Sequence, residues 1–135
     1  MMTSCSGRVT SVKDGDTIVL NGITTIRIAE IDAPEKAQPY GMDAKDHLRD
    51  LVIGRTIKYI DLGYDKYGRH ICKVYVNKQN IGHQMVKDGY AWAYTKFKLS
   101  DSVELYQSQA RANRLGMWQS SFNIYPSVWR YEHKR

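Results

Sequence analysis

Five short segments rich in β-branched residues lie within the first 76 residues of this 135-residue chain. Valine, isoleucine and threonine favour extended backbone, because their branched side chains pack well on the pleated surface of a sheet. The sequence therefore predicts strands over 8–13, 17–20, 24–30, 55–61 and 70–76. Five strands of this length suit a small β-barrel, and this restricts the fold more than any other feature of the chain.

Three segments with helical patterning lie between or after these strands, and each stops at a glycine. They cover 42–53, 81–88 and 101–115. Glycine favours such stops because it readily adopts the left-handed backbone that ends many helices. The last segment begins with a cap-like Asp101 and Glu104. Its face of Val103, Tyr106 and Ala110 is typical of a stripe that packs on a core, so we expect an α+β fold.

The chain has the length and the hydrophobic content of one domain. It is 42% hydrophobic and contains no repeat, low-complexity tract or linker, so we expect a single domain over 1–135. Lysine and arginine outnumber the acids 20 to 14, which gives a net charge of +6 and favours a polyanionic partner such as nucleic acid. No apolar run approaches the roughly 18 residues that a membrane span requires, so no membrane partner is expected. We expect a monomer.

The cysteines and histidines indicate neither a disulfide framework nor a zinc site. Cys5 and Cys72 allow at most one disulfide, and no Cys or His pair has the spacing of zinc ligands. Cys72, within "RHICKVYV", is expected to be a small buried core residue. The N-terminus "MMTSCSGRV" has no apolar signal core, and the doubled Met leaves open a signal peptide that has been removed.

The stretch "DGDTIVLNG" ends in an Asn-Gly dipeptide at 21–22, which predicts a hairpin with the following strand. A two-residue loop would set Asp16 opposite Arg27, but it would also oppose Ile18 to Thr25. A one-residue bulge instead gathers the aliphatic side chains on one buried face, namely Ile18, Leu20, Ile26 and Ile28. We prefer the bulge, which turns Arg27 away from the core and leaves its contact with Asp16 open by one residue.

The stretch "EIDAPEK" places acids at the end of the next strand. Pro34 stops that strand and keeps its neighbours extended, so Asp32 and Glu35 emerge on a rigid loop. An oxygen-only set of Asp16, Asp32 and a backbone carbonyl such as that of Ala33 fits calcium better than zinc. Taken separately, each acidic stretch is an ordinary solvated turn or loop, whereas their combination indicates a cation site.

The stretch "DKYGRHICKVYV" carries Lys66, Tyr67 and Arg69 into a strand. A guanidinium matches the geometry of phosphate oxygens, and a tyrosine hydroxyl adds a neutral hydrogen bond. Alone, this is a solvated hairpin tip. Together with the metal-binding acids, the spare carboxylate of Glu35 and the second guanidinium of Arg27, it supplies the groups that metal-assisted phosphodiester hydrolysis needs.

Five motifs in order resemble the signatures of the staphylococcal nuclease family. They are "VKDGDTIVL", "RIAEIDAPE", "DKYGR", "MVKDGYAWAY" and "RLGMW", and they span about 7–118. The resemblance implies an OB-fold barrel with three helices. It also implies a hydrolase, a calcium-dependent endonuclease that acts on DNA and RNA and leaves 3′-phosphate ends.

The resemblance implies a metal site and a group that activates water. Asp16 and Asp32 stand where the family's calcium carboxylates stand, and Ala33 stands where a backbone carbonyl joins them. Glu35 occupies the position assigned to activating the attacking water. The family often has threonine at Ala33, but only the main chain is needed there.

The resemblance also implies contacts to the substrate. Arg27 and Arg69 occupy the phosphate-clamp positions, and both count with Glu35 as catalytic. Lys66 and Tyr67 fall at substrate-phosphate positions, and Tyr94 at an aromatic near the base or sugar.

The sequence departs from the family pattern in three places. The segment between Glu35 and Tyr40 is shorter than the flexible loop of the best-known secreted member, as is the turn before Asp65. The match slips by a residue after the aromatic at 94, so a second stacking aromatic is either Phe97 or absent. Residues 119–135 extend beyond the shared core, and their aromatic residues and basic end either pack on the barrel or contact nucleic acid; we favour packing.

An alternative is a catalytically inactive OB-fold module that binds nucleic acid or another partner. Such a module has no use for three acids that face a phosphate, and Asp16, Asp32 and Glu35 are all present. Two carboxylates, a carbonyl and waters make a sparse cage, so calcium binding is expected to be weak, roughly 10⁻⁴ to 10⁻³ M. Since such a site is empty where calcium is scarce, we expect a secreted or periplasmic location.

Overall fold

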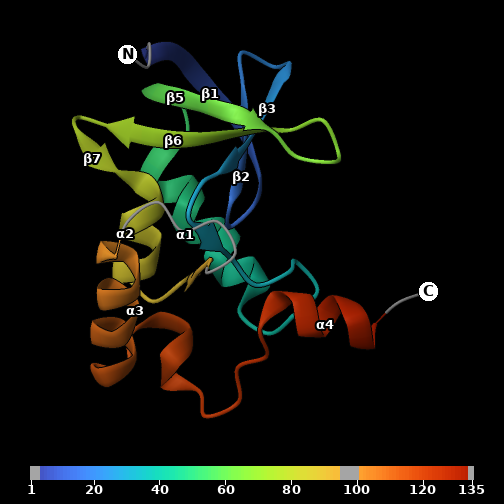
Figure 1. Cartoon of the computed structure of the whole chain (residues 1–135), viewed down its shortest axis with the longest axis vertical. Coiled ribbons are helices and arrows are strands. Elements are labelled where there is room, and N and C mark those ends of the chain that lie inside the picture. The colour runs from blue at the N-terminus through green and yellow to red at the C-terminus, as the bar shows by residue number, and fades with distance from the viewer. Residues whose placement is uncertain (1–3, 95–100, 134–135) are drawn as a thin grey trace.

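The computed structural model describes residues 4–94 and 101–133 (Figure 1). The strands are β1 (Ser4–Asp14), β2 (Thr17–Leu20), β3 (Thr24–Ile28), β4 (Ile31–Asp32), β5 (Thr56–Tyr64), β6 (His70–Val76), β7 (Gln79–Asn80) and β8 (Trp92–Ala93). The helices are α1 (Gly41–Val52), α2 (Ile81–Lys87), α3 (Ser102–Ala112), the 3₁₀ helix η2 (Gly116–Gln119) and α4 (Pro126–Glu132). No helix among these residues is both long and apolar enough to cross a bilayer.

Five strands close into a barrel, as the sequence predicts for an OB fold. Neighbouring strands follow the order β3-β2-β1-β5-β6, and β3 also pairs with β6 in parallel through Ile26 with His70 and Ile28 with Cys72. This last pairing closes the sheet. The barrel lies in the upper part of Figure 1 with α1, α2 and α3 below it. The α+β class and the five-stranded OB-fold barrel are therefore confirmed.

The β2–β3 hairpin adopts the register with the extra loop residue. Ile18 pairs with Ile26 and Leu20 with Thr24, so the loop holds three residues. Asn21 and Gly22 both have positive φ, 52° and 75°, which asparagine and glycine tolerate better than other residues. The expected aliphatic face is fully buried, namely Ile18, Leu20, Ile26 and Ile28.

The predicted strand over 24–30 is wrong at its end. β3 stops at Ile28, because Glu30 has a φ of 74° that no strand residue adopts. The chain then resumes as the short strand β4, which pairs with β8. This break places β4 in a two-stranded sheet with β8, separate from the barrel.

The helices agree with the prediction except at the C-terminal end. α2 ends at Lys87, and Gly89, two residues further on, has a φ of 84°, which is the expected left-handed stop. α3, however, ends at Ala112, because Arg114 already takes the left-handed conformation, with a φ of 54°, before Gly116 takes it as well, with a φ of 53°. Gly116 is needed for a second reason: a Cβ there would lie 2.5 Å from the Gly89 carbonyl oxygen.

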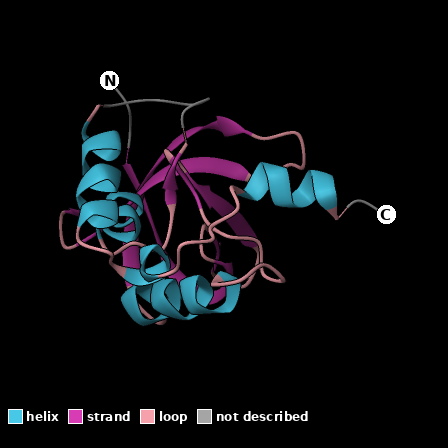
Figure 2. Ribbon diagram, turned by 90° about the horizontal axis from the view of Figure 1, so that it is seen from below, coloured by secondary structure: helices cyan, strands magenta, loops and turns pink. Residues whose placement is uncertain are grey.

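The expected count of three helices is also wrong, because residues 4–94 and 101–133 contain four α-helices. The fourth, α4, lies in the extension beyond 118 and stands apart from the other helices in Figure 2. The segment before α4 packs on a second cluster of buried residues through Tyr125, which meets Trp92 edge-on with ring centroids 5.5 Å apart. Cys72 lies in the main core, while Cys5 is exposed, and both thiols are free.

Candidate active site

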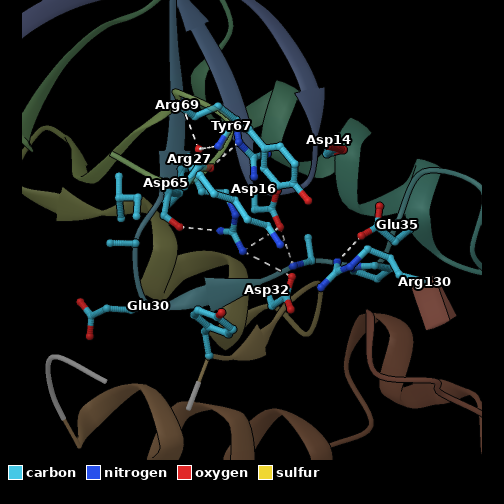
Figure 3. A pocket seen from close by; sticks show the side chains of 17 residues that line it. Asp14, Asp16, Arg27, Glu30, Asp32, Glu35, Asp65, Tyr67, Arg69 and Arg130 are labelled. Atoms are coloured by element: carbon cyan, nitrogen blue, oxygen red, sulfur yellow. Dashed lines mark hydrogen bonds and ion pairs between the residues drawn. The ribbon is translucent and has the colours of Figure 1, made fainter. Parts of the chain in front are cut away.

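A pocket of about 500 Å³ opens where the barrel meets the segment after β4. Its walls come from the β1–β2 turn, β3, the segment 33–35, the β5–β6 turn and α4 (Figure 3). Every site residue expected from the sequence lines it: Asp16, Arg27, Asp32, Ala33, Glu35, Lys66, Tyr67, Arg69 and Tyr94. The structure therefore brings together side chains that lie up to 78 positions apart in the chain, from position 16 to position 94.

Asp16 and Asp32 face each other across the guanidinium of Arg27. Arg27 Nη2 lies 3.6 Å from Asp16 Oδ2 and 3.4 Å from Asp32 Oδ1, so the contact between Asp16 and Arg27 that the sequence left open is present. Arg27 Nη1 donates to the carbonyl oxygens of Ile28 and Ile31, both at 2.8 Å. Four contacts hold this guanidinium in one orientation toward the pocket.

The position of Asp16 depends on the glycine that precedes it. Asp16 Oδ2 accepts the N–H of Ala33 at 2.9 Å, and its Oδ1 accepts the Thr17 hydroxyl at 3.0 Å. A Cβ at Gly15 would lie 2.8 Å from the Cβ atoms of Ala33 and Ala44. The "DGD" turn thus needs glycine to lie against the acidic loop and α1, which brings Asp16 to that loop.

Two carboxyl groups at the pocket have raised pKa values, first because they are buried and then because other carboxylates lie near them. Burial, and then the charge of Asp16, raises the pKa of Asp32 to about 7 despite the nearby Arg27. Burial, and then Asp16 and Glu35, raises the pKa of Asp14 to about 6. Asp14 Oδ1 is buried and has no hydrogen-bond partner among the described residues. Such a cluster is stabilised by a bound cation.

The donor set fits a cation that prefers oxygen ligands. The carboxylates of Asp16 and Asp32 offer oxygen ligands, and neither cysteine nor histidine is among the described residues that line the pocket. The described residues contain no group of three His, Cys, Asp or Glu side chains already gathered as a metal cage. The protein would therefore supply few ligands, Asp16 and Asp32 foremost, and solvent or substrate oxygens would complete the shell.

Glu35 is positioned through its main chain. Its N–H donates to Gln38 Oε1 at 2.9 Å, and its carbonyl oxygen accepts the N–H of Gln38 at 2.9 Å. Gly41 packs so closely that a Cβ there would lie 1.9 Å from the Glu35 carbonyl oxygen. The Glu35 side chain is 32% exposed and faces the pocket, where it forms an ion pair with Arg130 of α4.

The β5–β6 turn presents Arg69 through Asp65. Asp65 Oδ1 accepts the N–H groups of Tyr67 and Arg69, both at 2.9 Å, and Asp65 Oδ2 accepts Arg69 Nε at 2.6 Å. The Nη atoms of Arg69 stay directed at the pocket, with Nη1 3.5 Å from the Thr17 hydroxyl oxygen. Tyr67 is exposed, and the cations of Lys66 and Arg69 lie 5.2 and 5.4 Å from its ring centroid.

Tyr94 also lines the pocket, next to Arg27. Its ring centroid lies 5.9 Å from the guanidinium carbon of Arg27, so an aromatic face is available beside the clamp. Phe97, the alternative stacking residue, lies outside the described residues.

Four charged residues of the pocket are absent from the sequence-based prediction of the site: Asp14, Glu30, Asp65 and Arg130. Asp14 could have been predicted, because it stands two positions before Asp16 in "DGD". Asp65 was harder to predict, although it is the first residue of "DKYGR", a position where Asx turns are common. Arg130 could not be predicted from a local motif, because its partner Glu35 is 95 positions away.

Comparison with known proteins relates the chain to nucleases over most of its length. The family described as staphylococcal nuclease homologue matches residues 25–120. An uncharacterized endonuclease of Haemophilus influenzae is 40% identical over 131 residues, which cover 94% of this chain and 74% of that protein. A micrococcal nuclease of Shigella flexneri is 36% identical over 142 residues, covering 95% and 82%. A staphylococcal-like nuclease of Arabidopsis thaliana is 35% identical over 105 residues, covering 78% and 32%. With its barrel, its acidic pocket and this match, the chain belongs to the staphylococcal nuclease family.

Proposed function

We propose that the protein is a calcium-dependent nuclease that hydrolyses phosphodiester bonds of DNA and RNA and leaves 3′-phosphate ends. The observation that carries this proposal is the convergence of a cation-seeking carboxylate pair, a third carboxylate and two guanidiniums in one pocket. Membership of a nuclease family and similarity to proteins named as endonucleases support it.

In this proposal Glu35 acts on the attacking water, and the guanidiniums of Arg27 and Arg69 act on the phosphate. Glu35 accepts a proton from a water as the water oxygen forms a bond to phosphorus, and the bond from phosphorus to the 5′ oxygen breaks in line with the attack. The 5′ oxygen leaves with a proton from solvent. Arg27 and Arg69 donate to the equatorial oxygens, where the negative charge increases most in the transition state.

The remaining residues hold the cation and the substrate. Asp16 and Asp32, with the main chain of Ala33, would hold calcium, which supplies Lewis-acid charge at the phosphate when bound. Lys66 and Tyr67 bind a neighbouring phosphate, and Tyr94 offers a face to a base or sugar.

A binding module without catalysis remains the second candidate, because OB folds bind single strands through basic grooves and aromatic side chains. The raised pKa values of Asp14 and Asp32 favour the enzyme. A surface evolved only to bind a polyanion gains nothing from buried carboxylates that repel it.

We further propose a monomer that works outside the cytoplasm, either secreted or periplasmic. A sparse calcium site needs a calcium-rich compartment, and there the activity would spare the host's own nucleic acid. Fractionation of cells that express the natural gene, with a cytoplasmic marker enzyme as control, tests the location.

One assay tests the activity. Single-stranded DNA, double-stranded DNA and RNA are each incubated with the purified protein in calcium or in chelator, and the new ends are tested for removal of a 3′-phosphate by a phosphatase. We expect cleavage only with calcium. Stable binding without cleavage at any calcium concentration would favour the binding module instead.

A further inference from the structure

The helix α4 lies beyond the residues that the family model matches, yet it lines the pocket. The family match ends at residue 120, whereas α4 runs Pro126–Glu132 and contributes Arg130 to the pocket wall. None of the roles proposed above uses this helix.

The start of α4 is fixed beside the loop that carries Glu35. Gln38 bridges the two segments: its Oε1 accepts the Glu35 N–H, and its side-chain amide donates to the carbonyl oxygen of Ile124. Tyr125 packs edge-on against Trp92, and Pro126 at the first turn is buried. The anchoring sets the distance between Glu35 and the first turn of α4, so Arg130, one turn further on, reaches the pocket.

The guanidinium of Arg130 lies at the Glu35 side of the pocket. In Figure 3 it approaches the carboxylates from the side opposite Arg69 and Asp65, and its dashed contact runs to Glu35. The side chain is 53% exposed, and Glu35 is its only hydrogen-bond acceptor among residues 4–94 and 101–133. Most of its five N–H groups are therefore directed at solvent.

This ion pair is suited to exchange its partner. Half-exposed pairs contribute little net stability, because water screens both charges. A phosphate accepts two parallel hydrogen bonds from a guanidinium, in the same fork geometry as a carboxylate. Without a positively charged side chain at this end of the pocket, a phosphate beside Glu35 would be repelled by the carboxylates of Glu35, Asp14 and Asp32.

We propose that Arg130 is a third phosphate-binding guanidinium, which the C-terminal extension adds to the pocket. In the free protein its guanidinium pairs with Glu35, and when nucleic acid binds the guanidinium moves to a phosphate next to the scissile one. The transfer also frees the Glu35 carboxylate to face the attacking water. This proposal rests on the function proposed above and concerns how the same site holds its substrate.

The test measures binding separately from cleavage. A short fluorescein-labelled single-stranded DNA is titrated in chelator with the wild type, Arg130→Gln and Arg130→Lys, at salt concentrations of about 50 to 200 mM. Arg49→Gln is the matched control, because it removes the same charge from an exposed position on α1 that does not line the pocket. Thermal unfolding confirms that all variants are folded.

Each phosphate contact with a single strand contributes about 0.7 to the slope of log Kd against log salt concentration. We expect Arg130→Gln to lose about this much slope and to bind about three- to tenfold more weakly at low salt. Arg130→Lys should keep most of the slope, because it keeps the charge, and Arg49→Gln should match the wild type. In calcium, Arg130→Gln should raise KM and leave kcat within about threefold.

Two results would overturn the proposal. One is a slope for Arg130→Gln equal to that of the wild type. The other is a kcat that rises while KM and slope stay unchanged, which would make α4 an inhibitory element that occupies Glu35. A wild type that binds DNA but never cleaves it would refute the nuclease activity alone, because the slope measurement does not depend on cleavage.

Discussion

The residues of the pocket differ in how firmly the chain holds them. Arg27 donates to two main-chain carbonyl oxygens and is only 15% exposed, so little freedom is left for it to lose when a phosphate arrives. Glu35 is held through its main chain, and within 4–94 and 101–133 its side chain pairs only with the exposed Arg130. This difference suits the proposed roles, because a clamp benefits from rigidity, whereas a group that takes up a proton has to change partners.

Replacement of Glu35 by glutamine removes the proton acceptor and keeps the size of the side chain. We expect kcat to fall by about 10² to 10⁴, the usual range for loss of a positioned general base, while KM changes little. Steady-state cleavage of single-stranded DNA in calcium measures both. The control is Gln109→Glu on α3, which alters an exposed side chain outside the pocket. Turnover of Glu35→Gln within a few-fold of the wild type would remove Glu35 from the chemical step.

At the scale of elements, the β5–β6 turn depends on a single carboxylate. Burial acts to raise the pKa of Asp65, but hydrogen bonds from the backbone N–H and guanidinium of Arg69 and from the Tyr67 N–H outweigh it and hold that pKa below its ordinary value. A lowered pKa means that the ionised carboxylate stabilises the fold above the pKa of the unfolded chain. This stabilisation is lost as the pH falls through the pKa of the folded state.

We expect Asp65→Asn to cost about 1–2 kcal/mol of unfolding free energy at pH 7 and to lower kcat/KM about tenfold, because Arg69 loses its anchor. The loss of stability should shrink below about pH 4, where the wild type also loses the charge. Urea unfolding at several pH values measures it, with Asp46→Asn on the exposed face of α1 as control. An equal loss of stability at every pH would mean that the charge of Asp65 is unimportant.

The segment between β4 and α1 depends on close packing at a glycine. Because a Cβ at Gly41 would collide with the Glu35 carbonyl oxygen, Gly41→Ala has to displace the main chain that positions Glu35. We expect a loss of about 1–3 kcal/mol in stability and a fall of about 10- to 100-fold in kcat. Gly22→Ala at the hairpin tip is the control. Gly22 has a positive φ, so alanine is strained there and lowers stability, but this residue does not line the pocket. An equal fall in kcat for both variants would attribute the effect to stability alone.

Elements with regular patterning could be predicted from the sequence. The alternation of Ile18 and Leu20 against Ile26 and Ile28 selected the correct hairpin register, because a one-residue slip would have exposed half of this face. The break at Glu30 could not be predicted, because a glutamate in the left-handed conformation is locally unfavourable. In the fold the Glu30 side chain is buried, and its Oε1 lies 3.2 Å from His83 Nε2.

The candidate site could be predicted where the chain supplies local motifs, and not where it depends on distant packing. Asp16, Asp32 and Arg69 stand in short motifs, and the pocket contains all three. Arg130 stands in a seven-residue helix in which only Pro126 is buried, and the anchors at 124–126 bring it to the pocket. The shared core of the family could therefore be predicted from the sequence, whereas the contribution of the extension could not.

At the scale of the whole molecule, the buried carboxylates couple metal binding to stability. Asp14, Asp16 and Asp32 lie at the junction of the barrel with the segment before α1, where their mutual repulsion acts against the packing of these two parts. A cation bound there removes the repulsion, and a ligand that binds only the folded state stabilises it by mass action.

Calcium should therefore stabilise the folded protein by a small but measurable amount. With a dissociation constant of roughly 10⁻⁴ to 10⁻³ M, 10 mM calcium adds about 1.4 to 2.7 kcal/mol to the unfolding free energy, which raises the Tm by about 3–10 °C. Thermal unfolding across a calcium titration measures this, and Asp16→Asn should abolish most of the shift, whereas the exposed Asp43→Asn should keep it.

Magnesium should give a smaller shift and little activity, because it requires near-ideal octahedral geometry and releases water reluctantly. A sub-micromolar calcium constant without nucleotide, or full activity in magnesium with calcium chelated, would contradict a sparse calcium site and, with it, the calcium-rich compartment proposed for the enzyme.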